Sequence, residues 1–223
     1  LAADGSVVEA LSEVELQTLR STLKKLAPEA VAINLLFSYL DDTDEKRIAE
    51  IVPDGMFVSR SSHILPEYRE YERGITTWLN ASVGPLVQGY LHRLCAGVPQ
   101  ARVSVMQSAG GTIGAEQAGD EAVHMLLSGP AGGLAGAKYI GSLAGCHQLL
   151  SFDMGGTSTD VALLGNADGE TGPQAIGSQT ADLQLTTEGR IGPYPVGVPM
   201  VDMHTIGAGG GSIAYVDAGG LLQ

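Results

Sequence analysis

The stretch Leu149–Leu164, LLSFDMGGTSTDVALL, decides the fold that this sequence predicts. An apolar run leads into Asp153, two glycines and three hydroxyl residues follow, and a second apolar run begins after Asp160. Short apolar runs on both sides of a Gly-rich segment are typical of a β-hairpin. We therefore predict a strand, a tight turn and a second strand.

The turn of this hairpin carries residues suited to phosphate. Gly155 and Gly156 let backbone N–H groups approach a ligand closely, and successive N–H groups in such a turn form an anion-binding nest. Hydroxyl groups, which can donate to phosphate oxygens, are supplied by Thr157, Ser158 and Thr159. The alternative is an ordinary Gly-rich hairpin whose Asp residues face solvent, but the whole pattern favours phosphate binding.

Two carboxylates bracket the turn. Mg²⁺ prefers a few carboxylates together with water and substrate phosphates. Asp153 and Asp160 are therefore the candidate ligands of a hydrated Mg²⁺ and the candidate catalytic residues.

Composition narrows the class of protein. The chain has 223 residues, of which 44% are hydrophobic and 17% charged, which is typical of a soluble globular protein with one large or two small domains. No run of about 18 apolar residues occurs, so we expect no membrane span. The net charge of −13 argues against a nucleic-acid surface, although loop amides can still bind a nucleotide.

Cysteine and histidine patterns give no support to metal or Ser-His-Asp hydrolase sites. Cys95 and Cys146 lie far apart, and we expect isolated buried thiols in a reducing cytosol, hence a cytoplasmic protein. The sequence contains no His-x-x-x-His, Cys-x-x-Cys or Gly-x-Ser-x-Gly pattern. His204 precedes a Gly-rich run, but a lone histidine is more often a packed residue than a ligand.

Helix and strand patterns alternate before the central hairpin. Ser12 and Glu15 form a capping-box pattern, and Pro85 inside a long helical pattern should kink or break that helix. The alternation predicts an α/β fold with a parallel or mixed sheet. The expected elements are helices over Ser12–Leu26, Thr43 or Asp44 to about Ile51, Pro66–Ala96, Glu121–Leu127 and Ser128 to about Leu143, with strands over Ala30–Phe37, Phe57–Arg60 and Arg102–Gln107.

Further elements follow the hairpin. Asp182–Thr186 and Met200–Ile206 are strand candidates, and the polar stretch Gly165–Thr180 is expected to be a mobile loop or an extended hairpin.

Two other Gly-rich runs punctuate this pattern. SGPAGG at 128–133 opens a helix, where unpaired N–H groups and the helix dipole attract anions, but glycines that merely allow close packing explain it equally well. TIGAGGGS at 205–212 follows a strand and is shaped for phosphate or ribose contact, whereas a plain glycine linker would lack its tight apolar flanks. The nucleotide-contact candidates in the two runs are Gly129, Gly132, Gly133, Gly207, Gly209, Gly210, Gly211 and Ser212.

These runs carry a resemblance to a known family. DMGGTSTD resembles a phosphate loop of the actin-like ATPase superfamily, and its wording is similar to that of the hydantoinase A/5-oxoprolinase family. SGPAGG, TIGAGGGS and the stretch LPEYREYER at 65–73, with Thr76-Thr77 and Leu79–Ala81, strengthen the match. The last stretch suggests no chemical role of its own.

The resemblance implies an architecture. Actin-like ATPases have two ribonuclease-H-like halves with the nucleotide in the cleft between them, and each half supplies a phosphate hairpin. On that plan residues 1–97 resemble the end of the first half and residues 98–223 the start of the second. The sister Asp-x-Gly-Gly-Thr hairpin of the first half is absent, so we expect an internal fragment with half an active site.

The resemblance also implies an activity, which is ATP-dependent opening of a cyclic amide such as a hydantoin or 5-oxoproline. Phosphorylation of the carbonyl oxygen would make the carbon electrophilic before water attacks, with Mg²⁺ neutralising charge. Asp153 would position Mg²⁺ or activate the attacking group, and Asp160 would be a second carboxylate. The family implies ATP and Mg²⁺ as cofactors, a B-type partner subunit and a homo- or hetero-oligomer, with no nucleic acid or membrane partner.

Two alternatives stay open. Some members of the family are subunits of ATP-dependent ketone carboxylases, in which the acceptor is a ketone enol. A non-catalytic nucleotide-binding or subunit-interaction module would keep the same fold without turnover.

Overall fold

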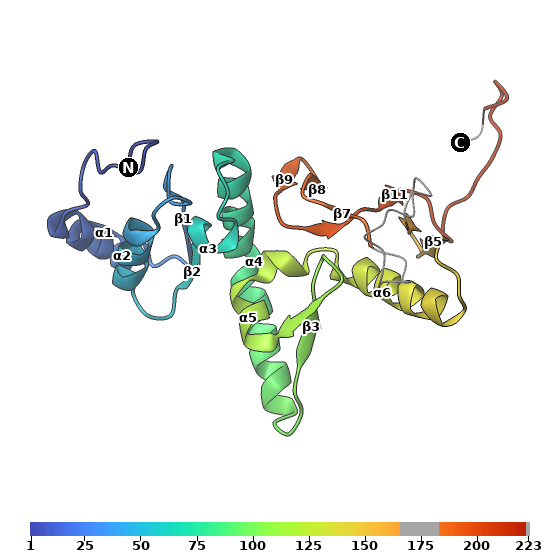
Figure 1. Cartoon of the computed structure of the whole chain (residues 1–223), viewed down its shortest axis with the longest axis horizontal. Helices are drawn as coiled ribbons and strands as arrows, with labels where there is room; N and C mark the ends of the chain where they lie inside the picture. Colours follow the sequence, from blue (N-terminus) through green and yellow to red (C-terminus); the bar gives the residue numbers. More distant parts are fainter. Residues whose placement is uncertain (166–182, 222–223) are drawn as a thin grey trace, which may run out of the picture. The chain divides into compact units, whose positions relative to one another are not determined.

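The computed structural model describes residues 1–165 and 183–221, which form two packing units. Figure 1 labels their helices and strands. The units are, first, Leu1–Gln107, Gly111–Leu126 and Thr187–Pro199, and second, Ser108–Gly110, Leu127–Thr186 and Met200–Gln223. The predicted loop over Gly165–Thr180 lies outside the described residues except for Gly165.

The first unit is built around one long helix, α4. The elements of this unit are α1 (Glu13–Leu26), β1 (Ala30–Ile33), α2 (Thr43–Ile51), β2 (Phe57–Arg60), α3 (Ser61–Ile64), α4 (Glu70–Gly97), β3 (Ser104–Met106), β4 (Thr112–Gly114), α5 (Ala115–Asp120), the 3₁₀ helix η1 (Ala122–Met125), β8 (Gly189–Ile191) and β9 (Tyr194–Val196). Helix α4 packs on β1, β2, α3, α5, η1 and β9. Strands β1 and β2 are parallel, as the helix–strand alternation predicts, while β3–β4 and β8–β9 are antiparallel.

Helix α1 confirms the predicted capping box. The Ser12 hydroxyl accepts from the Glu15 backbone N–H at 3.3 Å, and Glu15 Oε2 accepts from the Ser12 backbone N–H at 2.9 Å. The helix ends at Leu26 because Ala27 adopts the left-handed conformation (φ 45°) and Pro28 follows. Helix α2 begins at Thr43, so its cap is Asp42 and not Thr43 or Asp44 as expected, and Asp42 makes no side-chain capping bond.

The predicted strand over Ala30–Phe37 is wrong in its second half. Strand β1 ends at Ile33, and the loop that follows bonds to side chains instead of to a neighbouring strand. The Leu35 N–H donates to Glu45, while the carbonyls of Leu35 and Leu36 accept from Arg73. An apolar run alone cannot reveal such side-chain partners.

The predicted break at Pro85 does not occur, because α4 runs without interruption from Glu70 to Gly97. The alternative of a kink at this residue stays a prediction. Proline removes one backbone hydrogen bond from a helix interior and crowds the preceding turn. The packing of α4 on six other elements holds the segment helical at that cost. The helix also starts four residues later than the Pro66 expected from the sequence.

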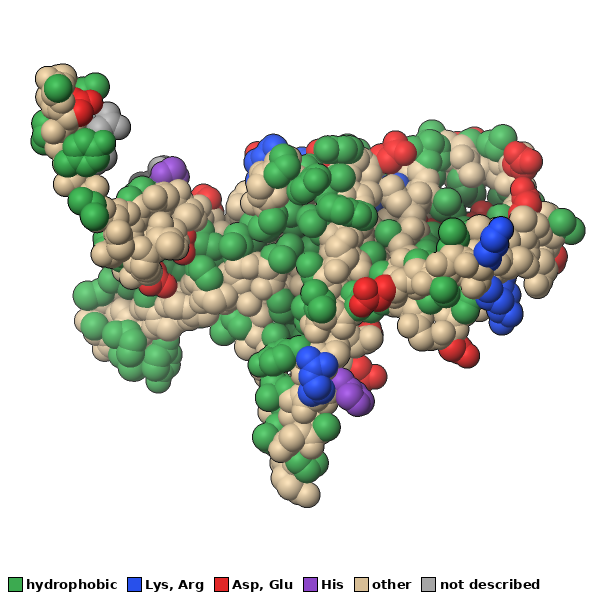
Figure 2. All heavy atoms as spheres, turned by 180° about the vertical axis from the view of Figure 1, so that it is seen from behind, with side chains coloured by type: hydrophobic (Ala, Val, Ile, Leu, Met, Phe, Trp, Pro, Cys, Tyr) green, Lys and Arg blue, Asp and Glu red, His purple; other side chains and the backbone are tan. Residues whose placement is uncertain are grey.

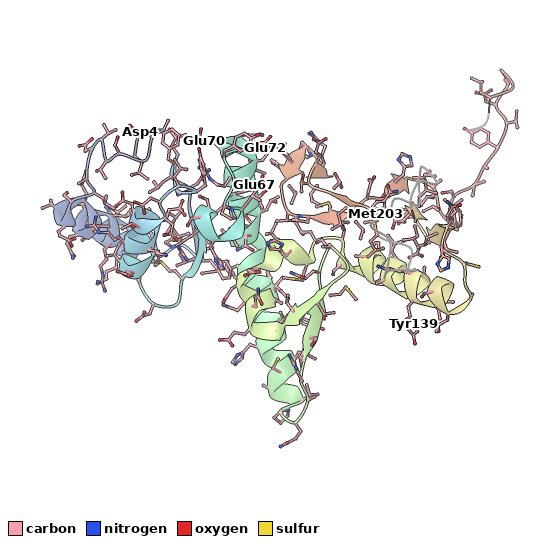
Figure 3. All side chains as sticks on the ribbon, viewed as in Figure 1. Asp4, Glu67, Glu70, Glu72, Tyr139 and Met203 are labelled. Atoms are coloured by element: carbon pink, nitrogen blue, oxygen red, sulfur yellow. The ribbon has the colours of Figure 1, made fainter. Side chains whose placement is uncertain are left out.

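Buried polar side chains of α4 assign a structural role to the stretch from residue 65 to residue 81, for which no chemical role was predicted. Arg73, fully buried, donates to Asn34 Oδ1 and to the backbone carbonyls of Glu67, Leu35 and Leu36. It therefore fastens the loop after β1 to the start of α4. Figure 3 labels Glu67, Glu70 and Glu72 in this region.

Thr76 and Asn80 continue this polar row along α4. The Thr76 hydroxyl accepts from the Gly197 N–H at 3.0 Å. Asn80 donates to the Asp120 carbonyl and accepts from the Val123 N–H, which ties α5 and η1 to α4. Residues 98–107 and 111–126 belong to the same packing unit as α4. The division of the chain after residue 97 stays a prediction.

The segment expected to be helical over Glu121–Leu127 is largely the short 3₁₀ helix η1. Its His124 is partly buried, and this burial holds the pKa of the imidazole below its ordinary value. Of the two thiols expected to be buried, Cys95 is only partly buried and Cys146 is exposed.

The second unit packs helix α6 on one face of a small sheet. The elements of this unit are α6 (Ser128–Leu143), β5 (Leu149–Met154), β6 (Thr159–Leu164), β7 (Leu185–Thr186), β10 (Met200–Val201) and β11 (His204–Ile206). The sheet has the order β11-β6-β5 with antiparallel neighbours, and β10 pairs with β7. The predicted strand over Met200–Ile206 is therefore two strands, interrupted at Asp202 and Met203.

Alternation along β5 and β6 decides which side chains enter the core. Ala162 and Leu164 pack with Ala131, Leu134 and Val201. Met203, labelled in Figure 3, lies against this core, whereas Tyr139 extends from α6 into solvent. The opposite face of the sheet exposes its apolar side chains, which are Leu150, Phe152, Met154 and Leu163.

The face drawn in Figure 2 shows little clustered positive charge. On the face drawn in Figure 2 the Lys and Arg side chains stand in small separate groups. Among the described residues, no helix combines the length and apolar composition that a membrane span requires.

The capping box gives a first testable prediction. Ser12→Ala removes both the hydroxyl acceptor and its bond to Glu15, and it should lower the free energy of unfolding by about 1 kcal/mol. Ser21→Ala is the matched control, because Ser21 lies exposed in the middle of the same helix and donates only to the Gln17 carbonyl. Chemical denaturation measures both, and equal stabilities of the two variants would contradict the cap.

A second prediction concerns the buried carboxylate of Glu45. Burial raises the pKa of this group, but hydrogen bonds from the Ser61 hydroxyl (2.6 Å) and from the backbone N–H groups of Ser62 and Leu35 (both 2.9 Å) outweigh it and hold the pKa below 4.5. A lowered folded-state pKa stabilises the fold fully above pH 4.5, and this stabilisation is lost as the pH falls through the folded-state value.

Glu45→Gln should therefore lower the free energy of unfolding by about 1–3 kcal/mol at pH 7, and the difference from the unaltered chain should shrink towards pH 3. Glu50→Gln, an exposed position on the same helix, should change stability little at either pH. A difference that stays constant with pH would show that the Glu45 charge does not stabilise the fold.

Candidate functional site

The register of the second unit's sheet brings the two predicted carboxylates together. Asp153 on β5 pairs directly with Asp160 on β6, and Asp160 pairs with Thr205 on β11. Directly paired residues share a face of an antiparallel sheet, so the three side chains form one row. The Thr205 hydroxyl donates to Asp160 Oδ1 at 2.7 Å and fixes the orientation of that carboxylate.

This row borders a small cavity of about 190 Å³. Asp153 and Asp160 line it from the sheet, Pro130 and Gly133 line it from α6, and Met203 completes one wall. The cavity thus joins the first predicted loop to the SGPAGG run. Its volume suits a few water molecules or one small group, not a whole nucleotide.

The turn between β5 and β6 leaves three consecutive amides available. The Gly155 N–H donates to the Ser158 carbonyl at 2.9 Å and closes the turn. Within the described part of the chain, the backbone N–H groups of Gly156, Thr157 and Ser158 have no hydrogen-bond acceptor. Gly156 and Thr157 are exposed, whereas Ser158 is partly buried.

The TIGAGGGS run folds onto this turn. The Gly210 N–H donates to the Gly155 carbonyl at 2.9 Å, and the Gly211 N–H donates to the Gly156 carbonyl at 2.8 Å. The Thr159 hydroxyl, which the sequence assigns to phosphate, donates to the Ala208 carbonyl at 2.6 Å. Two loops that lie about fifty residues apart in the sequence therefore form one structure.

The SGPAGG run is the first part of α6 itself and not a turn before it. Ser128, Gly129 and Pro130 are the first three helical positions, where proline is tolerated because these N–H groups have no partner within the helix. A Cβ added to Gly129 or Gly133 would meet nothing within 4 Å. Close packing therefore does not explain these two glycines within the described residues.

The structure brings only a small set of possible metal ligands together at this site. Among the described residues no cluster of three or more His, Cys, Asp or Glu side chains is arranged for a metal. The donors near the turn are the two carboxylates, a set compatible with a Mg²⁺ that keeps waters and phosphate oxygens. His204 pairs with Val161, so its side chain lies on the face opposite Asp160.

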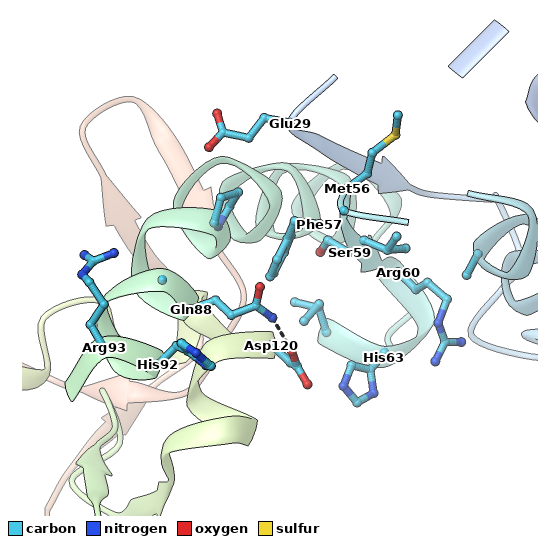
Figure 4. Close-up of a pocket in the computed structure, with 16 residues that line it drawn as sticks. Glu29, Met56, Phe57, Ser59, Arg60, His63, Gln88, His92, Arg93 and Asp120 are labelled. Atoms are coloured by element: carbon cyan, nitrogen blue, oxygen red, sulfur yellow. Dashed lines mark hydrogen bonds between the residues drawn. The ribbon is translucent and has the colours of Figure 1, made fainter. Parts of the chain in front are cut away.

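A larger cavity that the sequence did not indicate lies in the first unit. Figure 4 shows this space of about 910 Å³ beside β2, with Phe57 and Arg60 on one side and Gln88, His92 and Arg93 of α4 on the other. It contains none of the predicted site residues. Arg60 is already paired with Asp42 at 3.6 Å, and Asp120 accepts a hydrogen bond from the neutral Gln88 side chain at 3.2 Å. The residues that line this cavity come from separate segments of the chain, so they form no motif in the sequence.

Comparisons with known proteins identify the family of this chain. A family model described as hydantoinase/oxoprolinase matches residues 73–223. The caprolactamase subunit alpha of Pseudomonas jessenii is 31% identical over 99% of this chain and 31% of its own length. The 5-oxoprolinase of Saccharomyces cerevisiae is 31% identical over 94% of this chain and 16% of its own.

Solved structures give the same result. The crystal structure of an ATP-dependent caprolactamase from Pseudomonas jessenii superimposes with a TM-score of 0.79 and 29% identity, over 100% of this chain and 31% of that one. A nucleotide-free acetone carboxylase, from work on ATP-dependent acetone carboxylation, gives a TM-score of 0.70 and 27% identity over 97% and 30%. The chain thus spans about a third or less of the length of these proteins. Over that span, it belongs to the hydantoinase/oxoprolinase family.

Proposed function

We propose that this chain supplies the second phosphate loop of an ATP-dependent enzyme that opens cyclic amides. The observation that carries the proposal is the turn at Gly155–Ser158. Its three amides without acceptors stand between a pair of carboxylates and a second glycine loop. Such a turn binds phosphate oxygens through backbone N–H groups, which needs no basic side chain in a chain of net charge −13.

The proposal includes an actin-like ATPase architecture. Residues 1–97 would form the end of the first ribonuclease-H-like half, and residues 98–223 would form the start of the second. The mixed α/β fold and its likeness to an ATP-dependent caprolactamase support this assignment. The other phosphate hairpin would then come from a part of the enzyme that this sequence does not include.

The residues of the turn would act on the phosphates. The N–H groups of Gly156, Thr157 and Ser158 would donate to phosphate oxygens and hold the terminal phosphoryl group. Asp153 would orient either the hydration shell of a Mg²⁺ or the attacking group, while Thr205 holds Asp160 as the second carboxylate. When bound, Mg²⁺ would neutralise part of the phosphate charge.

The reaction assigned to the whole enzyme is phosphoryl transfer followed by hydrolysis. The amide carbonyl oxygen takes the terminal phosphoryl group of ATP, and ADP leaves. Water then attacks the activated carbon, the ring C–N bond breaks, and the amine leaves with a proton, so that an acyl phosphate remains. A second water hydrolyses the acyl phosphate to the carboxylic acid and inorganic phosphate. A cyclic amide substrate is supported by the family description and by the caprolactamase relative.

Partner and location complete the proposal. A B-type subunit in a homo- or hetero-oligomer would complete the enzyme, which is supported because the caprolactamase relative is named as a subunit. We place the enzyme in the cytoplasm, where ATP and Mg²⁺ are available.

A ketone carboxylase is the second candidate function, and the likeness to acetone carboxylase favours it. Both activities need the same phosphate loop, so the turn cannot separate them. An assay of the complete enzyme with ATP distinguishes the two activities. It compares ring opening of 5-oxoproline, hydantoin and caprolactam with bicarbonate-dependent consumption of acetone. Binding of ATP without either reaction would point to a non-catalytic module.

The role of Asp153 gives a testable prediction. In the complete enzyme, Asp153→Asn should keep the fold and lower ATP-coupled turnover at least about 100-fold, because the amide cannot replace the carboxylate near Mg²⁺ or as a base. Asp54→Asn, an exposed turn residue of the first unit, is the matched control and should keep full turnover. Undiminished turnover of Asp153→Asn would remove this residue from the mechanism.

A further inference from the structure

We propose that the glycine loop Gly207–Ser212 is a latch that orients the phosphate-binding amides, and that Thr159 is a positioning residue that holds the latch closed. The consequence for nucleotide affinity rests on the proposed function. The latch itself rests on the hydrogen bonds and close contacts between two loops of the second unit, and it is tested separately.

The Thr159 hydroxyl is buried and donates its hydrogen bond within the protein. Thr159 is only 3% exposed, and its Oγ1 donates to the Ala208 carbonyl at 2.6 Å. A buried hydroxyl with this partner is not directed at a phosphate in solvent. Instead it joins the first residue of β6 to the start of the latch.

Backbone bonds fasten the latch directly to the turn. The carbonyls of Gly155 and Gly156 accept from the N–H groups of Gly210 and Gly211. A trans peptide unit is planar, so its C=O and its N–H point in opposite directions. When both carbonyls face the latch, the N–H groups of Gly156 and Thr157 must face away from it. The latch therefore sets the direction of two of the three amides in the nest.

Close contact requires glycine at two positions of the latch. A Cβ on Gly209 would lie 2.7 Å from the Gly155 carbonyl oxygen and 2.9 Å from the backbone nitrogens of Thr157 and Ser158. A Cβ on Gly211 would lie 2.7 Å from the Gly156 carbonyl oxygen. These neighbours are backbone atoms that cannot swing aside, so any side chain at either position pushes the loops apart.

Hydrogen bonds within the latch also fix its own conformation. The Ser212 N–H donates to the Gly209 carbonyl at 2.9 Å, and the Gly209 N–H donates to the Ser212 hydroxyl at 3.0 Å. This pair of bonds makes residues 209–212 a defined turn that meets the hairpin as one piece. A mobile glycine linker would not have these bonds.

The direct test uses NMR to measure how fast backbone amide protons of this chain exchange with water in the absence of nucleotide. Thr159→Val keeps the shape of the side chain but removes the donor, and exchange at Gly210 and Gly211 should become about fivefold faster or more, as expected for the loss of one hydrogen bond. Thr159→Ser keeps the donor and should restore slow exchange. Thr22→Val is the matched control, because the Thr22 hydroxyl also donates to a backbone carbonyl, that of Thr18, but in α1.

Gly209→Ala tests the same contact from the other loop. It should speed exchange at Gly210 and Gly211 as Thr159→Val does, because the new Cβ forces the loops apart. Gly136→Ala, where an added Cβ meets nothing within 4 Å, is its control and should leave exchange unchanged. Unchanged exchange in both Thr159→Val and Gly209→Ala would overturn the latch.

The affinity for Mg²⁺-ATP, measured by calorimetry on the same variants, tests what the latch does. Thr159→Val and Gly209→Ala should weaken binding about five- to tenfold, and Thr159→Ser should retain it. Faster exchange with unchanged affinity would overturn the positioning role. If this chain alone does not bind Mg²⁺-ATP, the same variants are compared in the complete enzyme. Absence of binding by the unaltered complete enzyme would count against the proposed function, and the exchange experiment would still decide whether the latch exists.

Discussion

The register of the three strands β11-β6-β5 is the constraint on which the site depends. A shift by one residue in any strand would move its side chains to the other face of the sheet, because side chains alternate along a strand. In the observed register Asp153, Asp160 and Thr205 form one row, and Ala162 and Leu164 enter the core beneath α6. Burial of the apolar residues thus fixes the position of the polar ones. The chemistry at the end of the hairpin is positioned by the hydrophobic core at its base.

The fold was predictable from the sequence where the determinants are local. The capping box of α1, the hairpin of β5 and β6, and the helix that starts at Ser128 all follow from residues within a few positions of one another. The predictions that are wrong depend on distant partners. Strand β1 stops at Ile33 because Arg73 and Glu45 take the backbone groups of the next loop, and both side chains come from other helices.

In the candidate site, too, some features could be predicted from the sequence and others could not. The two glycine loops and the two carboxylates could be found from their composition, because phosphate binding needs a particular set of residue types. Their mutual arrangement could not, since the bonds from Gly210 and Gly211 to the turn join backbone groups that carry no sequence pattern. Thr159 illustrates the limit. The motif assigns its hydroxyl to phosphate, whereas the structure pairs it with the Ala208 carbonyl.

Phosphate binding by the amides of the turn at Gly155–Ser158 can be tested by titrating the ¹⁵N-labelled chain with Mg²⁺-ATP and following the backbone signals by NMR. If these amides bind phosphate, the largest shifts should appear at the N–H groups of Gly156, Thr157 and Ser158, and they should be lost in Asp153→Ala. Shifts that instead concentrate around the cavity beside β2, at Arg60, His92 and Arg93, would place the nucleotide in the first unit and rule out phosphate binding by the turn.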